Sequence, residues 1–368
     1  ETIAYASYAK WIKSWRDLPL RLNFWNSVLR AEIKSTKPFL RTSEFLWQEG
    51  HTVHATREEA DEQVTRILRL YRRLMEEYLA IPVLAGLKSE REKFVGALYT
   101  ATLEAVMPDG KALQMGTAHN LGQNFSKAFD IKYVGKDDQE HYAWNTSWGV
   151  SWRVIGGMIM DHGDDKGLVL PPKIAPIQVV IIPIFYSEEE KGRVLDKAGM
   201  VLSKLRKAKL SVELDDRTQY TPGWKFNEWE MRGVPLRIEI GPRDVQNNRV
   251  TAARRDTRER ATLKDEELIA GVKKLLKEIQ ANLFLRAKRF LEEHITPART
   301  YDEFKKVLES KGGFVKAYWC LSDICEEKVK EETGATIRLI PFEEEKALGR
   351  CIYCGKSAKK IAYFAKAY

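Results

Sequence analysis

The chain has 368 residues, of which 44% are hydrophobic and 31% charged, a composition typical of a soluble globular protein of two or three domains. No apolar run approaches the roughly 18 residues that a transmembrane helix needs, so we expect no membrane association. The net charge of +9 is only a weak indication of a polyanionic partner, and the charge is not concentrated in a basic tail. The composition therefore neither establishes nor excludes nucleic-acid binding.

The chain begins with "ETIAYASYAKWIKSW", which has neither an initiator methionine nor a signal-peptide pattern. We therefore expect an internal start, with the N-terminal part of the natural protein absent. All four cysteines lie in the last fifty residues. This clustering favours one localised site in a reducing compartment, and hence a cytoplasmic protein, over a disulfide framework.

The segments "NSVLRAEIKS" and "FLRTSEFLWQEGH" predict two antiparallel strands joined by a loop of about ten residues. Arg30 and Glu32 share one face of the first strand, and Phe45 and Glu49 share one face of the second, so all four are expected in one pocket, with Arg41 at the end of the loop. This set of side chains suits a nucleoside triphosphate: the arginines can neutralise phosphates, the ring can stack on adenine, and the carboxylate can hold a metal or an amine. The alternative is a half-exposed hairpin with ordinary cross-strand ion pairs.

Residues 57–80 carry an apolar stripe at helical spacing, with Thr56 and Glu59 as a capping box. From about 94 to 170, short β-type runs predict a mostly antiparallel sheet. Beyond the prolines near 171–176, a buried strand at 177–185, a helix from Ser187 to about 207, further strands and a helix near 222–231 predict an α/β domain. A long amphipathic helix at 265–294 then leads to a small final domain at about 295–368.

The tail contains "CLSDIC", a gap of 25 residues and then "CIYC". This is the two-knuckle spacing of a tetrahedral structural zinc site, and it uses every cysteine of the chain. Two disulfides or free core thiols are the alternatives. The expected ligands are Cys320, Cys325, Cys351 and Cys354.

Two motifs resemble those of class II aminoacyl-tRNA synthetases. "VLRAE" followed by "RTSEFLWQE" resembles motif 2, and "TSWGVSWRVIGGMIMDHGDDKGLVLPP" resembles motif 3. More narrowly, "KWIKSWRDLPLRLN", "FLWQEGHT", "MPDGKALQMGTAHNLGQNF" and "GDDKGLVLPPKIAP" resemble prolyl-tRNA synthetases of the archaeal and eukaryotic type, over essentially the whole chain. The implied fold is α+β and multidomain: a class II catalytic core at 1–176 that lacks motif 1, an α/β anticodon-binding domain at 177–283 and a small zinc-binding α/β domain at 284–368.

The resemblance implies roles for individual residues. Arg30 would hold the α-phosphate and the substrate carboxylate, Glu32 would support the site, and Arg41 and Arg153 would grip the distal phosphate. The other implied contacts to ATP and its Mg²⁺ come from Phe45, Gln114 and Ser151. The residues implied to line the proline pocket, besides Arg30, are Glu1, Trp47, Glu49, His51, Phe94, Thr117, His119, Ser147, Trp148 and Gly149.

This pocket makes chemical sense because proline is a rigid ring with a secondary ammonium, which needs aromatic walls and a carboxylate. Glu1 or Glu49 would supply that carboxylate. Taken singly, His119 is more often a structural histidine and Trp148 a core residue; their joint place in the motifs reverses that interpretation. Phe24, Ala31, Leu98 and Trp152 differ from the residues common in the family.

The segment "GVPLRIEIGPRDVQNNRVTAARRDT" resembles a class IIa anticodon-binding domain. Arg237, Glu239, Arg243 and Asp244 would read the anticodon of tRNA(Pro), since arginine seeks acceptors and carboxylate seeks donors on base edges. Charged residues at a strand edge are the competing interpretation. The ending "AYFAKAY" resembles family members whose last residue, here Tyr368, reaches back to the catalytic domain.

The implied activity is the two-step ligation of L-proline to tRNA(Pro) at the expense of ATP, by positioning and electrostatics without a covalent nucleophile. Motif 1 carries the dimer interface of class II enzymes, so the full-length protein is expected to be a homodimer. About ninety residues separate motifs 2 and 3, too few for an editing insertion, so we expect no hydrolysis of mischarged alanine in cis. The alternatives are a non-catalytic paralogue that binds tRNA or a regulatory partner, and a class IIa enzyme for another small amino acid.

Overall fold

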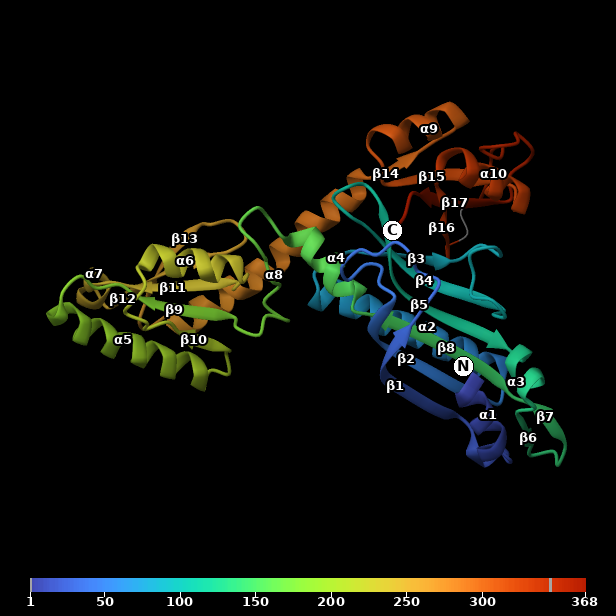
Figure 1. Ribbon diagram of the computed structural model, residues 1–368, viewed down its shortest axis with the longest axis horizontal. Helices are drawn as coiled ribbons and strands as arrows, with labels where there is room; N and C mark the ends of the chain where they lie inside the picture. Colours follow the sequence, from blue (N-terminus) through green and yellow to red (C-terminus); the bar gives the residue numbers. More distant parts are fainter. Residues whose placement is uncertain (1, 344–345) are drawn as a thin grey trace. The chain divides into compact units, whose positions relative to one another are not determined.

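The computed structural model describes residues 2–343 and 346–368 and divides into two compact units (Figure 1). The first unit comprises the residues up to Met75, residues 82–157 and residues 290–368, and the second comprises residues 76–81 and 158–289. Glu1, predicted to line the proline pocket, lies outside the described residues. Within the described part of the chain, no helix combines the length and the apolar character that a bilayer crossing requires.

A ten-stranded sheet organises the first unit, in the order β1-β2-β8-β5-β4-β3-β16-β17-β15-β14. All neighbouring pairs are antiparallel except β14 with β15, which confirms the antiparallel sheet that the sequence predicted. The strands are β1 (Leu20–Leu29), β2 (Glu44–His54), β3 (Leu84–Leu87), β4 (Tyr99–Val106), β5 (Ala112–Gly122), β8 (Trp144–Ser151), β14 (Ile295–Pro297), β15 (Phe314–Trp319), β16 (Thr336–Pro341) and β17 (Lys360–Ala365).

One strand pair joins the two ends of the chain within this sheet. β16 pairs with β3 through Ile340 opposite Leu87 and Pro341 opposite Gly86, so the C-terminal strands extend the sheet that begins near the N-terminus. Period-two patterns predict single strands but not which of them meet across some 250 residues. The strands of the tail therefore belong to the same ten-stranded sheet as the strands from the first part of the chain.

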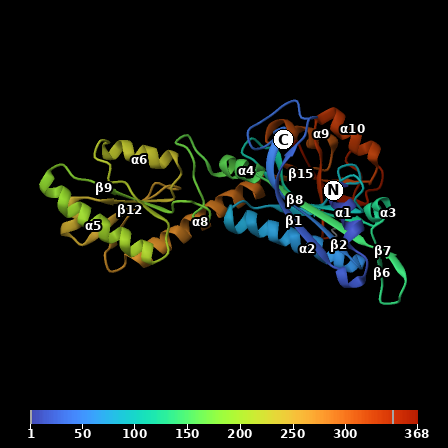
Figure 2. The same cartoon turned by 60° about the horizontal axis from the view of Figure 1, so that its bottom comes forward.

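The helix α2 (Arg57–Arg73) covers one face of the strands and ends in a π-helical turn, Leu74–Tyr78 (Figure 2). It begins where predicted, because the Thr56 hydroxyl accepts a hydrogen bond from the Glu59 backbone N–H at 3.2 Å. Tyr71 of this helix donates to Gln48 of β2 at 2.6 Å. Because side chains alternate along a strand, Trp47 and Glu49 point to the opposite face of the sheet, which α2 leaves open.

The remaining elements of the first unit are shorter and flank the sheet. A hydrophobic core around Phe304, Ile337 and Phe364 holds the C-terminal strands and helices together. These elements are α1 (Thr2–Trp11), the 3-10 turn η1 (Trp15–Asp17), α3 (Asn124–Phe129), β6 (Lys132–Val134), β7 (Glu140–Tyr142), α9 (Tyr301–Ser310) and α10 (Asp323–Thr333), together with the start of α4 (Arg153–His162) and the end of α8 (Leu268–Glu293).

The second unit is the predicted α/β domain, with a sheet in the order β10-β9-β11-β12-β13. β9 runs parallel to β10 and β11, and every residue of β9 is buried, as expected for a strand covered on both faces. Helix α5 starts where predicted, with Ser187 as its cap. The elements are β9 (Val179–Pro183), α5 (Glu188–Lys207), β10 (Val212–Leu214), α6 (Pro222–Met231), β11 (Leu236–Ile240), α7 (Pro242–Gln246), β12 (Arg249–Arg254), β13 (Arg260–Lys264) and most of α8.

Candidate active site

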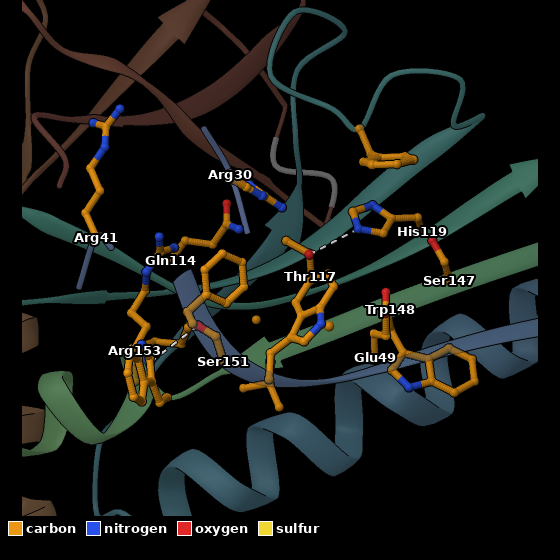
Figure 3. A pocket seen from close by; sticks show the side chains of 18 of the residues that line it. Arg30, Arg41, Glu49, Gln114, Thr117, His119, Ser147, Trp148, Ser151 and Arg153 are labelled. Atoms are coloured by element: carbon orange, nitrogen blue, oxygen red, sulfur yellow. Dashed lines mark hydrogen bonds between the residues drawn. The ribbon is translucent and has the colours of Figure 1, made fainter. Parts of the chain in front are cut away.

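A pocket of about 280 Å³ lies on the open face of the large sheet (Figure 3). It contains all the residues predicted for ATP and proline except Glu1, which is not described, and Glu32. The predicted residues that line it are Arg30, Arg41, Phe45, Trp47, Glu49, His51, Phe94, Gln114, Thr117, His119, Ser147, Trp148, Gly149, Ser151 and Arg153.

Strand register explains how residues so far apart in sequence meet here. β2 and β5 both pair with β8, so residues of all three strands lie in rows across the sheet. One such row is Glu49, Gly149 and Thr117, and the next is His51, Ser147 and His119.

Glycines make room for two indoles on opposite faces of the sheet. A Cβ atom on Gly149 would lie 2.8 Å from the ring of Trp47 on the pocket face, and one on Gly50 would lie 2.0 Å from the ring of Trp148 on the face that α2 covers. Both distances are shorter than van der Waals contact, so a side chain at Gly149 would displace a wall of the pocket, and one at Gly50 would displace the indole on the other face. Among the described residues, the buried Trp47 indole N–H has no hydrogen-bond partner.

Guanidinium groups gather at one end of the pocket. Arg153, the first residue of α4, donates from Nε to the Leu40 carbonyl at 2.9 Å, and its backbone N–H donates to Ser151. Burial lowers the pKa of Arg153, and the positive charges of Arg30 and Arg41 act in the same direction. Figure 3 shows Gln114 and Arg153 near each other at this end, with Arg41 on the same side and its guanidinium extended away from them. Such a set attracts a polyanion.

The first strand is shorter than predicted, which separates Arg30 from Glu32. β1 ends at Leu29. The Arg30 N–H still donates to the Ser43 carbonyl at 2.6 Å, so Arg30 stays beside β2. Its guanidinium lies 5.4 Å from the ring centre of Phe45. Glu32 follows in an exposed turn and is not a lining residue. The prediction that Glu32 shares a strand face with Arg30 is wrong, because the chain turns before reaching it.

A carboxylate and aromatic rings form the other end. Glu49 accepts hydrogen bonds from Asn26 at 2.9 Å and from His51 at 3.1 Å. Burial raises the pKa of Glu49, but these hydrogen bonds outweigh it and the net shift is downward. The carboxylate is therefore ionised at neutral pH. In Figure 3, Glu49, Ser147, Trp148 and His119 lie away from the arginines.

His119 is a neutral, fixed residue between two threonines. Its ring nitrogens lie 2.8 Å from the Thr100 hydroxyl and 3.1 Å from the Thr117 hydroxyl. Burial, together with the neighbouring His51, lowers the pKa of His119 to about 4. The ring of Phe94 lies 4.9 Å from that of His119, so the two form one wall.

The comparisons with known proteins cover the whole chain. Residues 1–162 match the family described as tRNA synthetase class II core domain (G, H, P, S and T), residues 178–275 match the anticodon binding domain, and residues 301–368 match the prolyl-tRNA synthetase C-terminal domain. The chain is 58% identical over 368 residues to a proline–tRNA ligase of Cenarchaeum symbiosum, 56% to one of Alkaliphilus oremlandii and 52% to proline–tRNA ligase 2 of Clostridioides difficile. The chain belongs to the proline–tRNA ligase family.

Each of these alignments covers the entire chain and 76–77% of the relative. The family assignment confirms the predicted combination of a class II core, an anticodon-binding domain and a C-terminal domain. The last residue contacts the core: the Tyr368 hydroxyl donates to Asp109 at 2.5 Å, and the Lys37 ammonium lies 4.3 Å from the Tyr368 ring centre. The prediction that Tyr368 reaches back to the core is confirmed.

Several residues that line the pocket were not predicted to do so from the sequence pattern. Lys88, Glu92, Thr100 and Trp152 all line the pocket. Lys88 and Glu92 lie in the charged segment "KSEREKF", which has no periodicity and resembles a solvated loop. Only the tertiary fold places this loop over the pocket.

Of the four residues predicted to read the anticodon, three have side-chain partners among the described residues: Arg237, Glu239 and Asp244. Arg237 is paired with Glu239 and Glu230, and Asp244 accepts from the Gly241 N–H at 3.1 Å at the start of α7. Glu239 is buried, whereas Arg243 is exposed. The structure brings Arg237 and Glu239 together and leaves Arg243 available to solvent.

An exposed aromatic pair in the same unit was not singled out from the sequence. The rings of Tyr220 and Trp224 are stacked, with centres 3.8 Å apart and planes at 10°, and 37% and 42% of these residues is exposed. The guanidinium of Arg217 lies 5.0 Å from the Tyr220 ring centre. Exposed aromatic rings beside an arginine are typical of surfaces on which nucleotide bases stack.

The cysteines of the tail meet as predicted. The sulfur atoms of Cys320, Cys325, Cys351 and Cys354 all lie within 4.8 Å of one another, and all four are free thiols. The Cys320–Cys325 sulfur distance of 3.7 Å is far longer than the roughly 2.05 Å of a disulfide. The backbone N–H of Lys356 lowers the pKa of Cys354 to about 7, whereas burial raises the pKa of Cys320 and of Cys325; a bound metal would favour the thiolate form of its ligands. The donor set fits a tetrahedral zinc ion.

Proposed function

We propose that this chain activates L-proline with ATP and transfers it to tRNA(Pro). One observation carries the proposal: a single pocket has three arginines at one end and an ionised carboxylate between aromatic rings at the other. A nucleotide phosphate chain suits the first end, and a small amino acid with a secondary ammonium suits the second. Membership in the proline–tRNA ligase family agrees with this division.

In the first step, an oxygen of the proline carboxylate attacks the α-phosphorus of Mg²⁺-bound ATP, and pyrophosphate leaves. Arg30 would hold the α-phosphate and the proline carboxylate, and Arg41 and Arg153 would hold the distal phosphates. Phe45 would carry the adenine, and Gln114 and Ser151 would complete the contacts to ATP or its Mg²⁺. The catalytic contribution is positioning plus stabilisation of the negative charge that spreads in the transition state.

In the second step, a hydroxyl of the terminal adenosine of tRNA attacks the carbonyl carbon of prolyl-adenylate, and AMP leaves. No side chain forms a covalent bond. The neutral His119 acts as a wall and not as a cation, because its low pKa keeps it unprotonated near pH 7.

The proline subsite would recognise the ring and the nitrogen separately. Glu49 would accept hydrogen bonds from the secondary ammonium. Thr117, Ser147 and Gly149 would border the ring from the strands, while His51 orients Glu49 through its 3.1 Å contact. The remaining walls are Trp47, Phe94, His119 and Trp148.

We infer three functional domains with the bounds 1–176, 177–283 and 284–368. The second would bind the anticodon of tRNA(Pro), with exposed Arg243 as a candidate for base edges and Trp224 as a candidate for stacking. The four cysteines would hold a structural zinc ion. Homodimerisation of the full-length protein, a cytoplasmic location and the lack of alanine editing remain predictions.

The test is proline-dependent exchange of pyrophosphate into ATP by the full-length protein. We expect exchange with proline, and a loss of about 10²-fold or more for Arg153→Ala, since the variant lacks a charge that stabilises the transition state. The matched control is Arg66→Ala, because Arg66 is exposed on α2, away from the pocket. An absence of proline-dependent exchange in the wild-type protein would support the non-catalytic alternative instead.

A further inference from the structure

The segment between β3 and β4, residues 88–98, is held by the C-terminal part of the chain. The Ser89 hydroxyl donates to Glu326 of α10 at 2.6 Å, and both residues are buried. Two more contacts follow at the surface, between Arg91 and Glu327 at 3.2 Å and between Lys330 and Glu92 at 3.8 Å. Three residues of one helix thus contact three residues of one short segment.

A second anchor holds the beginning of the same segment. Lys88 donates to Glu104 of β4 at 2.7 Å, and Glu104 accepts two more hydrogen bonds from Arg338 of β16, at 2.9 and 3.1 Å. Glu104 is completely buried and lies opposite Gln114 of the pocket in the strand register. The C-terminal strand β16 therefore fixes Lys88 through a shared carboxylate.

The held segment forms one wall of the pocket. Lys88, Glu92 and Phe94 all line it. The Phe94 N–H donates to the Thr100 hydroxyl at 3.0 Å, and that hydroxyl also contacts His119 at 2.8 Å. The position of the Phe94 ring thus depends on a segment that Glu326 and Glu104 anchor through buried side chains.

The anchoring helix also carries a cysteine of the metal cluster. Cys325 is the neighbour of Glu326 in α10, and Cys320 lies just before the helix begins. A metal bound by the four thiolates would tie the first turn of α10 to the 351–354 knuckle. It would thereby fix the backbone from which Glu326 reaches Ser89.

We propose that Glu326 and Ser89 are positioning residues, through which α10 and its four-cysteine site set the place of Phe94 and hence the affinity for the amino acid. The inference deepens the proposed function, because the pocket concerned is the proposed proline site. The metal is then structural for the tail and also sets substrate affinity at a distance.

Steady-state pyrophosphate exchange with Glu326→Ala and Ser89→Ala in the full-length, zinc-loaded protein tests the contact. Losing a buried hydrogen bond of this kind is expected to raise the KM for proline about five- to thirty-fold, while the KM for ATP changes less than about twofold. Glu326→Gln keeps an oxygen that accepts from Ser89 and is expected to restore the KM. The matched control is Glu327→Ala, which removes only the exposed pair with Arg91 and should change neither constant.

Hydrogen exchange followed by mass spectrometry gives a readout independent of activity. The Lys93 amide donates to the Ser89 carbonyl and the Phe94 amide to the Thr100 hydroxyl, bonds that Ser89→Ala does not remove directly, whereas the Glu92 amide donates to the Ser89 hydroxyl itself. We expect the Lys93 and Phe94 amides to exchange faster after chelation of the metal, and faster in Ser89→Ala even when zinc content, measured by elemental mass spectrometry, is unchanged. Ser89→Ala changes no residue of the tail, so it still tests the positioning role if Glu326→Ala fails to fold.

The outcomes separate the two proposals. A wild-type protein without proline-dependent pyrophosphate exchange refutes the proposed function, while faster exchange of the Lys93 and Phe94 amides in Ser89→Ala would still establish the anchor. An active wild type in which Ser89→Ala has an unchanged KM for proline and unchanged amide exchange overturns the positioning role.

Discussion

At the scale of single residues, the charge of Glu49 follows from its neighbours. Asn26 and His51 each hydrogen-bond one of its carboxylate oxygens, and their effect on the pKa exceeds that of burial. A group whose pKa is held below its ordinary value stays charged throughout the range in which enzymes are usually assayed. Glu49 is thus ready to accept hydrogen bonds from a cationic nitrogen without first losing a proton.

The substitution Glu49→Gln tests this role. It preserves the shape of the side chain but removes the charge, so we expect the KM for proline in pyrophosphate exchange to rise about 10- to 100-fold, as for a lost charge-assisted hydrogen bond. Between pH 6 and 8 the wild-type KM should not vary through Glu49, because its pKa is lowered. The control is Glu44→Gln on the same strand, an exposed residue that bonds only Ser27 among the contacts described. Equal KM values for the two variants would contradict the role.

Residue-level prediction succeeded where a strand carried the residue and failed where the strand ended. Trp47 and Glu49 share a face because β2 continues past both. Glu32 was placed with Arg30 on the same argument, but β1 ends at Leu29. A strand end depends on tertiary pairing, which a period-two pattern does not contain.

At the scale of elements, the close contact of β2 and β8 shapes the pocket. Gly149 pairs with Glu49, and the Trp47 indole occupies the space that a Cβ atom on Gly149 would need. Sequence patterns identified both strands, and helix caps such as Thr56 and Ser187 identified two helices, because these signals are local. The pocket contacts of residues 88–93 were not predicted, because this part of the chain is held by residues more than 200 positions away, and the expected strand beginning near Phe94 starts only at Tyr99.

Replacing Gly149 by alanine should therefore disturb the pocket more than the strand itself. The added Cβ atom would lie 2.8 Å from the Trp47 ring, so the indole must move, and we expect a loss of about 1–3 kcal/mol in the free energy of unfolding together with a higher KM for proline. The control is Gly199→Ala on α5, where a Cβ atom meets none of the described residues within 4 Å and the better helix former should be neutral or slightly stabilising. Chemical denaturation and exchange kinetics would measure both effects. A Gly149→Ala protein as stable and active as Gly199→Ala would show that the Trp47 indole can move without cost.

At the scale of the whole molecule, the first unit is one sheet built from both ends of the chain. The ladder between β3 and β16 is short, and beside it lies the buried carboxylate of Glu104 between Lys88 and Arg338. Neither feature follows from the sequence, since matching an arginine to a glutamate 234 positions earlier requires the fold itself. Breaking such a pair leaves a buried charge without part of its compensation.

Arg338→Met keeps much of the side-chain volume but removes one of the two cations that face Glu104. We expect the free energy of unfolding to fall by about 3 kcal/mol, measured by denaturant titration with tryptophan fluorescence. Arg91→Met, which removes only an exposed pair, should cost less than about 1 kcal/mol.

The pKa of Glu104 gives this prediction a pH dependence. Burial raises the pKa of Glu104, but Lys88 and Arg338 lower it by more than burial raises it, so the net shift is downward from 4.5. The ion pairs of Glu104 therefore stabilise the fold fully above pH 4.5, and this stabilisation is lost as the pH falls through the folded-state pKa of Glu104. The difference in the free energy of unfolding between Arg338→Met and Arg91→Met should therefore become smaller in acid. A difference that stays constant from pH 7 down to the acid transition would mean that Arg338 contributes through packing alone.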